Sequence, residues 1–256
     1  MIPVGDFLRR RTTPYVNWTL IAANIAVFVY MLTMNTRPDE ILGALDTSEA
    51  DRFLLDWGFV PACIADTLRI GTDADPDALA ELCRSDGKGF TQLFTTMFVH
   101  GGWAHIAGNM LFLWIFGDNV EDRMGHARYL AFYSLCGFAA GLTETVMAPD
   151  TAVPAVGASG AIAGVLGAYL VLAPTAMVQV VVLPFIFLPF FVPAVLLIGF
   201  WFVTQLFAGL AEVGSHSTVG AGVAWWAHVG GFVAGVVLIW PFKRRRRPER
   251  GAAVSF

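Results

Sequence analysis

Charged residues are scarce in this chain of 256 residues. Only 14% of them are Asp, Glu, Lys or Arg, while 56% are apolar, and a soluble domain usually carries about 25% charged residues. Most of the charges crowd into four zones, which are 1–11, 37–88, 118–128 and 243–250. The long apolar stretches between these zones exclude an ordinary soluble protein and indicate several crossings of a membrane.

Cysteine is also rare, and neither a CxxC pair nor an HExxH motif occurs. These absences argue against a zinc site, so we expect no metal and no other cofactor. Of the three cysteines, Cys136 lies in an apolar stretch and is expected to be a core residue. Cys63 and Cys83 fall in a charged zone, where a disulfide persists if the zone lies outside the cytoplasm. The sequence allows this bridge without deciding it.

Six apolar stretches predict membrane-spanning helices, at about 15–34, 102–116, 127–147 and 159–172, inside 192–213, and at about 219–240. Residues 177–191 are also apolar but include Pro184 and Pro189, and proline disrupts a helix interior. We expect an interfacial or loop segment there, with a seventh span as the alternative. The predicted fold class is therefore an all-α, polytopic membrane protein.

Basic residues predict the orientation, because Lys and Arg gather on the cytoplasmic side of a membrane. Arg9, Arg10 and Arg11 precede the first span, and a basic run begins at Lys243 after the last. We therefore expect a cytoplasmic N-terminus (1–14), a membrane domain (15–241) and a basic cytoplasmic tail (242–256). Residues 35–89 hold twelve acidic and five basic residues and are expected to form an acidic loop outside. The tail is expected to touch anionic lipid, and nothing points to nucleic acid.

Polar side chains inside the apolar stretches are costly in a membrane and need an explanation. His105 and Asn109 are four residues apart and so share one helix face, just after His100 on the entering loop. Both can donate a hydrogen bond to one point, which suits an oxyanion. Hydrogen bonding between neighbouring helices is the other interpretation.

Ser159 and His228 are the other two polar groups. Ser159 lies between small residues at the start of the fourth span, and His228 shares its helix face with Gly231 and Gly235. Such small residues let two helices approach closely. We expect His228 to reach the Ser159 hydroxyl and act as its base. A helix-capping serine and a histidine bonded to a backbone carbonyl are the structural alternatives.

No acidic residue obviously completes a catalytic triad. Glu144 and Glu212, near the outer ends of the third and fifth spans, are the best-placed carboxylates. We therefore predict a Ser–His dyad. A transporter is disfavoured because the two halves of the chain show no internal repeat.

Taken together, these motifs resemble those of the rhomboid intramembrane proteases in order and spacing, over about residues 94–240. The family patterns HxxxxHxxxN, GxSG and AHxxGxxxG are matched here by His100, His105 and Asn109, by Gly157, Ser159 and Gly160, and by Ala227, His228, Gly231 and Gly235.

The resemblance implies a six-helix rhomboid-like bundle that acts as an intramembrane serine endopeptidase on single-pass transmembrane proteins. It implies Ser159 as nucleophile, His228 as base, and an oxyanion hole made by His105, Asn109 and the Ser159 N–H. The supporting positions would be His100, Gly157, Gly160, Gly231 and Gly235. We expect a bacterial inner membrane as the location. The alternative is a catalytically silent relative that binds transmembrane helices, and the sequence specifies no oligomeric state.

Two positions depart from the family pattern. Thr91-Gln92 stands where many members have Trp-Arg, and Ala163 stands where many have a tyrosine against the catalytic histidine. We expect another aromatic residue, Trp225 or Trp226, to orient His228.

Overall fold

Six apolar helices form the body of the protein, as predicted. The computed structural model describes residues 2–34, 48–71, 75–83, 89–182, 185–215 and 223–244. The six are α1 (Tyr15–Met31), α6 (Trp103–Phe112) continued by the π-helical turn η2 (Leu113–Gly117), α8 (His126–Met147), α9 (Ser159–Leu172), α10 (Ala194–Ser215) and α11 (Trp225–Phe242). By length and composition α8, α10 and α11 can cross a membrane, while α1 and α9 are apolar but shorter. The predicted all-α membrane class is confirmed.

Some predicted boundaries shift by a few residues. The first helix ends at Met31 rather than at 34, and the last begins at Trp225 rather than at 219. Residues 219–222 and the tail beyond Arg244 lie outside the described residues. Apolar composition marks where a helix can lie in a membrane, whereas its ends depend on local backbone bonding, so such shifts are expected.

The centre of the bundle is α9, whose residues 160–169 are all buried. Its tightest contact is with α11, and it is made by glycines. A side chain at Gly231 would overlap the carbonyl oxygen of Gly160, and one at Gly235 would overlap that of Gly164. The two helices therefore touch backbone to backbone, which only small residues allow.

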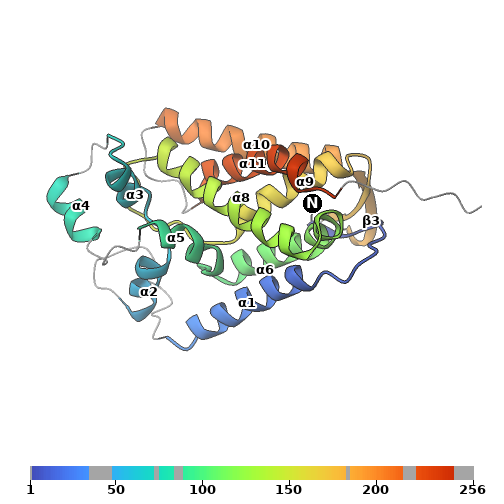
Figure 1. Ribbon diagram of the computed structural model, residues 1–256, viewed down its shortest axis with the longest axis horizontal. Helices are drawn as coiled ribbons and strands as arrows, with labels where there is room; N and C mark the ends of the chain where they lie inside the picture. Colours follow the sequence, from blue (N-terminus) through green and yellow to red (C-terminus); the bar gives the residue numbers. More distant parts are fainter. Residues whose placement is uncertain are drawn as a thin grey trace, which may run out of the picture.

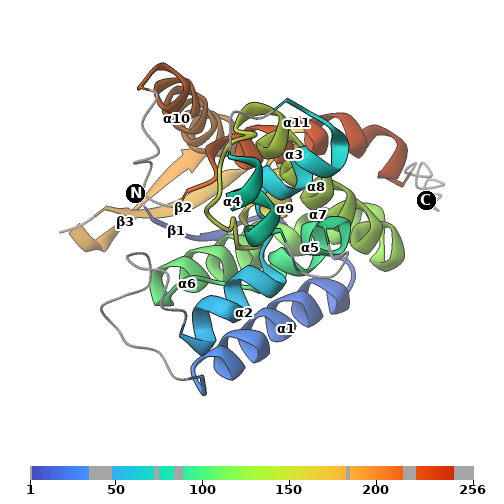
Figure 2. The ribbon, with the colours of Figure 1, turned by 90° about the vertical axis from the view of Figure 1, so that its left-hand side faces the viewer.

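Helix α10 lies at the edge of the bundle and runs from the end of β3 along the length of the molecule (Figures 1 and 2). In the most apolar 18-residue stretch of α10 only 22% is buried, whereas the corresponding share is 44% in α8 and in α11. Most of its side chains therefore face the surroundings, and the few that turn inward stand out.

Helical segments between α1 and α6 gather at one end of the molecule (Figure 1). They are α2 (Glu49–Trp57), α3 (Pro61–Leu68), α4 (Pro76–Leu82), α5 (Gly89–Thr95) and the 3-10 turn η1 (Thr96–Phe98). The predicted acidic loop 35–89 is thus partly helical. A disulfide joins Cys63, in α3, to Cys83, just after α4, and Cys136 is a buried free thiol. Backbone bonds tie this region to the segment before α9, where Phe59 pairs with Ala155.

A small sheet at the opposite end was not predicted (Figure 1). It consists of three antiparallel strands in the order β1-β2-β3. They are β1 (Ile2–Asp6), β2 (Met177–Val182) and β3 (Phe185–Pro193). Strands therefore stand where an interfacial or loop segment was expected at 177–191, so the expectation of a loop was wrong, and so was the alternative of a seventh span. Proline argues against a helix there but is tolerated in an edge strand, which is where Pro189 lies.

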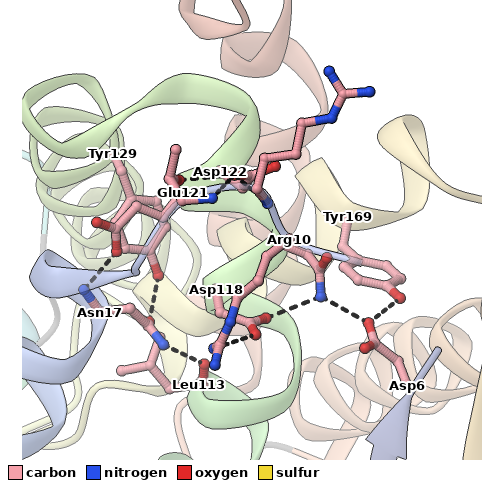
Figure 3. Close-up of polar contacts among 12 residues, drawn as sticks. Asp6, Arg10, Asn17, Leu113, Asp118, Glu121, Asp122, Tyr129 and Tyr169 are labelled. Carbon is pink, nitrogen blue, oxygen red and sulfur yellow. Dashed lines mark hydrogen bonds and ion pairs between the residues drawn. The ribbon is translucent and has the colours of Figure 1, made fainter. Parts of the chain in front are cut away.

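A network of polar groups anchors the N-terminal strand to the bundle (Figure 3). Asp6 accepts hydrogen bonds from the hydroxyl of Tyr169, at 2.6 Å, and from the amide of Asn119, at 2.9 Å. Arg10 forms an ion pair with Asp118, at 3.1 Å. Asn119 and Asp118 belong to α7 (Asp118–Met124), which connects η2 to α8.

The same connector holds the start of α1 and the end of α11. Glu121 accepts from the backbone N–H of Asn17 at 2.7 Å, and the Asn17 side chain bonds Tyr129 of α8 at 2.8 Å (Figure 3). The backbone N–H of Arg244 donates to Arg123 at 2.9 Å. Both ends of the described chain therefore lie at the sheet end of the bundle, as an even number of spans requires.

The glycine contact predicts a stability effect. Gly235→Ala should lower the free energy of unfolding by roughly 1–3 kcal/mol, because the new methyl group meets the Gly164 backbone. Gly199→Ala is the matched control, since a side chain there meets nothing within 4 Å. Thermal unfolding in detergent measures the stability of both variants. A Gly235→Ala protein that melts at the same temperature as the Gly199→Ala protein would contradict the packing argument.

The partly buried carboxyl group of Asp118 predicts a pH dependence of stability. Burial and the neighbouring Asp6 raise the pKa of Asp118 to about 6, against the opposing effect of Arg10. Its unfolded pKa is about 4, so the folded state holds the proton more tightly. The stability that this group provides is therefore complete below about pH 4 and falls as the pH rises to about 6. Unfolding at pH 4 to 8 should show a smaller fall for Asp118→Asn than for wild type; identical slopes would refute this assignment.

Candidate active site

Ser159 and His228 meet at the end of the bundle opposite the sheet. Ser159 is the first residue of α9, and His228 lies in the first turn of α11. The imidazole Nε2 of His228 lies 2.8 Å from Ser159 Oγ, which is hydrogen-bonding distance for a serine and its base. Both side chains are half-buried. The glycine contact between α9 and α11 lies directly behind this pair.

Glu144 fixes the first turn of α11 from the side of α8. Its carboxylate accepts the backbone N–H of Ala227, the residue before His228, at 2.7 Å. The sequence singled out Glu144 as one of two well-placed carboxylates, and the structure gives it a contact with the backbone rather than with the imidazole. The residue hydrogen-bonded to Nδ1 of His228 is Gln205 of α10, whose Oε1 lies 2.7 Å away.

Gln205 was missed by the sequence analysis. It is a neutral residue outside all three motifs, and it is one of the few buried polar side chains of α10, only 7% exposed. A signal was present, because a polar residue within an apolar span demands a partner.

Aromatic rings flank His228 on two sides. Trp225, one turn before it in α11, lies edge-on with its centre 6.2 Å from the imidazole, and Trp201 of α10 lies 5.8 Å away. Trp225 was one of the two expected neighbours. Trp226, the other, is buried beside Gly209, and Trp201 was not anticipated.

His105 and Asn109 converge beside the serine. A side chain added at Gly157, two residues before Ser159, would lie 2.6 Å from His105 Nε2 and 3.5 Å from Asn109 Nδ2. Gly157 has φ +119°, a conformation that favours glycine. The Nδ2 group of Asn109 is buried and contacts no acceptor among the described residues. A buried donor without a described acceptor therefore lies beside Gly157, two residues before Ser159.

The loop before α6 supports this pair of donors. His100 is 1% exposed, and its ring packs edge-on against His105 at a centre distance of 5.1 Å. The carbonyl of Thr96 accepts the backbone N–H of Gly157 at 3.0 Å. Gln92, where many rhomboids have arginine, bonds the carbonyls of Leu55 and Asp56 at the end of α2. In this chain an amide thus ties α5 to α2.

The arrangement has the parts that acyl transfer requires. It offers a nucleophile, a base and two side-chain donors, and Ser159 N–H is one of the groups that a helix start leaves free. Among the described residues, no group of three or more His, Cys, Asp and Glu could hold a metal ion.

A family model described as the Rhomboid domain matches residues 87–245, which is more than half of the chain and includes every residue of this site. The chain belongs to the rhomboid family. Rhomboid domains are helical membrane bundles, in agreement with the fold, so this rhomboid protein is an integral membrane protein.

Named rhomboid relatives differ in source and in name. RHOMBOID-like protein 6, mitochondrial, of Arabidopsis thaliana is 29% identical over 172 residues, which cover 63% of this chain and 53% of the relative. Rhomboid protease GluP of Bacillus subtilis is 42% identical over 82 residues, 32% of this chain and 16% of that protein. Inactive rhomboid protein 1 of Drosophila melanogaster is 31% identical over 81 residues, which cover 32% of this chain and 6% of that protein. The rhomboid chain thus spans about half of the first relative and less of the other two.

The converging donors predict how fast Ser159 reacts with a fluorophosphonate, a probe that labels activated serines. Asn109→Ala should slow labelling of this rhomboid roughly a hundredfold, because one donor to the developing oxyanion is lost. Asn24→Ala is the control, since the Asn24 amide bonds Leu20 within its own helix α1. Equal labelling rates for Asn109→Ala and wild type would remove Asn109 from the oxyanion hole.

Proposed function

We propose that this rhomboid protein is an intramembrane serine endopeptidase that cleaves single-pass transmembrane proteins in or near their span. The observation that carries the proposal is the 2.8 Å contact between Ser159 Oγ and His228 Nε2, made beside two convergent donors. The family membership supports it, and so does the name of the Bacillus relative, a rhomboid protease.

The chemistry follows from the geometry. Neutral His228 accepts the Ser159 proton at Nε2 while Oγ attacks the carbonyl carbon of the scissile peptide bond. The oxygen of that carbonyl becomes an oxyanion, which His105, Asn109 and the Ser159 N–H stabilise. His228 then gives the proton to the leaving amine, and water hydrolyses the acyl-enzyme by the same route in reverse.

A helical substrate must unwind before it can react, because its peptide carbonyls are closed off by the helix. The catalytic pair lies at the first turns of α9 and α11 rather than at their middles. A cut near one end of a substrate's span suits this depth, since unwinding there leaves few backbone groups unsatisfied in lipid.

The proposed orientation places both termini, the sheet and α7 in the cytoplasm, with the catalytic end outside. The basic residues Arg9, Arg10 and Arg11 lie near that inner end, as the distribution of positive charge in membrane proteins favours. The named relatives include a mitochondrial and a bacterial protein, so they do not support a bacterial inner membrane over an organelle.

The alternative function is binding of transmembrane helices without cleavage. The name of the Drosophila relative, inactive rhomboid protein 1, supports a family member without activity. The complete Ser–His contact in this chain favours the enzyme.

The test is cleavage of a panel of single-span model substrates by the purified protein in liposomes. Ser159→Ala and His228→Ala should each lower turnover by roughly a thousandfold or more, while folding normally. Ser134→Ala, the same change on α8 outside the site, is the matched control and should cleave like wild type.

Either of two results would overturn the proposal. Cleavage that persists undiminished in Ser159→Ala would mean that Ser159 is not the nucleophile. Folded wild-type protein that binds the substrates, cleaves none of them and resists fluorophosphonate would establish the silent alternative.

A further inference from the structure

We propose that Gln205 is the positioning residue that sets the tautomer of His228, in the place where a triad would have a carboxylate. This inference rests on the proposed function. It concerns a residue outside the motifs, on a helix that contributes neither the nucleophile nor the base. The argument comes from the direction of the hydrogen bonds that meet at this amide.

The order of donors and acceptors in this chain of hydrogen bonds is set at the hydroxyl of Thr204. Its single hydrogen is donated to the backbone carbonyl of Trp201, at 2.6 Å. The oxygen is then free only to accept, and it accepts from Nε2 of Gln205 at 3.1 Å. Reversing the Gln205 amide would set its oxygen against the lone pairs of Thr204. The orientation with Oε1 toward His228 is therefore the favoured one.

The same order of donors and acceptors continues through the imidazole of His228. Oε1 of Gln205 can only accept, so the proton of neutral His228 lies on Nδ1, which is 2.7 Å away. Nε2 is then left without a proton and can accept from Ser159, at 2.8 Å. The opposite tautomer would place a proton between Nε2 and the nucleophile and would abolish general-base activity. Gln205 thus selects the reactive form.

Packing limits the motion of this amide. Gln205 is 7% exposed although α10 lies at the edge of the bundle. Trp201, one turn before it, lies beside the imidazole with ring centres 5.8 Å apart. The face of α10 that carries Trp201 and Gln205 is therefore the one that contacts the catalytic histidine.

An amide suits this position better than a carboxylate would. A buried carboxylate in an apolar site carries a large desolvation cost unless it is paired, whereas an amide oxygen accepts the same hydrogen bond without a charge. A negative charge would also stabilise the protonated imidazole, which cannot act as a base. The neutral acceptor therefore keeps His228 active at lower pH than a carboxylate would.

The experiment compares Gln205→Leu, Gln205→Glu and wild type in the liposome cleavage assay. Gln205→Leu should lower kcat about tenfold or more and change KM less than about threefold, because only the base is affected. Gln205→Glu keeps the acceptor and should restore most of kcat, with the acidic limb of its pH–rate profile shifted to higher pH. Gln179→Leu, the same change on β2 at the far end of the bundle, is the matched control.

A second measurement does not depend on proteolysis. Solid-state NMR of protein labelled with ¹⁵N-histidine, with His228 assigned by its loss in His228→Ala, reports which ring nitrogen carries the proton. Wild type should show the proton on Nδ1, and Gln205→Leu should show a mixture of tautomers. This result stands even if no substrate is cleaved, so failure of the proposed function and failure of this inference are distinguishable.

Two outcomes would overturn the inference. One is a folded Gln205→Leu protein with the wild-type kcat and tautomer. The other, decisive even if Gln205→Leu does not fold, is a Gln205→Glu protein with an unshifted pH–rate profile. A shifted profile and a mixed tautomer would establish Gln205 as the positioning residue.

Discussion

The backbone contact between α9 and α11 is the constraint on which the rest of the site depends. Gly231 and Gly235 lie against the carbonyls of Gly160 and Gly164, and no side chain separates the two helices. Ser159 and His228 lie at the near ends of the same two helices, so the helix separation sets the distance between their reactive atoms. A helix pair kept apart by larger side chains would leave the base out of reach of the nucleophile.

Contacts from other helices then fix the orientation of the two reactive groups. Glu144 holds the first turn of α11 through the N–H of Ala227, and Gln205 of α10 holds the imidazole itself. The loop before α6 brings His105 and Asn109 to Gly157. The polar network around Asp6 and α7 lies at the other end of the bundle, where it holds β1 against α7 and α9. These polar contacts thus lie at the two ends of the bundle, and the glycine contact between α9 and α11 lies between them.

The three motifs were predictable because each is a short local pattern, and two residue sets in them share one helix face, His105 with Asn109 on α6 and His228 with Gly231 and Gly235 on α11. A polar or small residue repeated every three or four positions faces the same neighbour whatever the rest of the fold does. The sheet was not predictable in this way, since β1 and β2 are more than 170 residues apart in the chain and their pairing is non-local. Gln205 was missed for a similar reason, because its importance depends on which residue faces it from another helix.

From its composition and motifs alone, the sequence determined the membrane class, the family resemblance and the residues that could react. These properties depend on which residues are present and on their spacing within short segments of the chain. Only the tertiary structure decided that Ser159 and His228 are within hydrogen-bonding distance, that the partner of His228 is Gln205, and that β2 and β3 are strands. Those outcomes depend on contacts between distant segments, and such contacts exist only once the helices have packed.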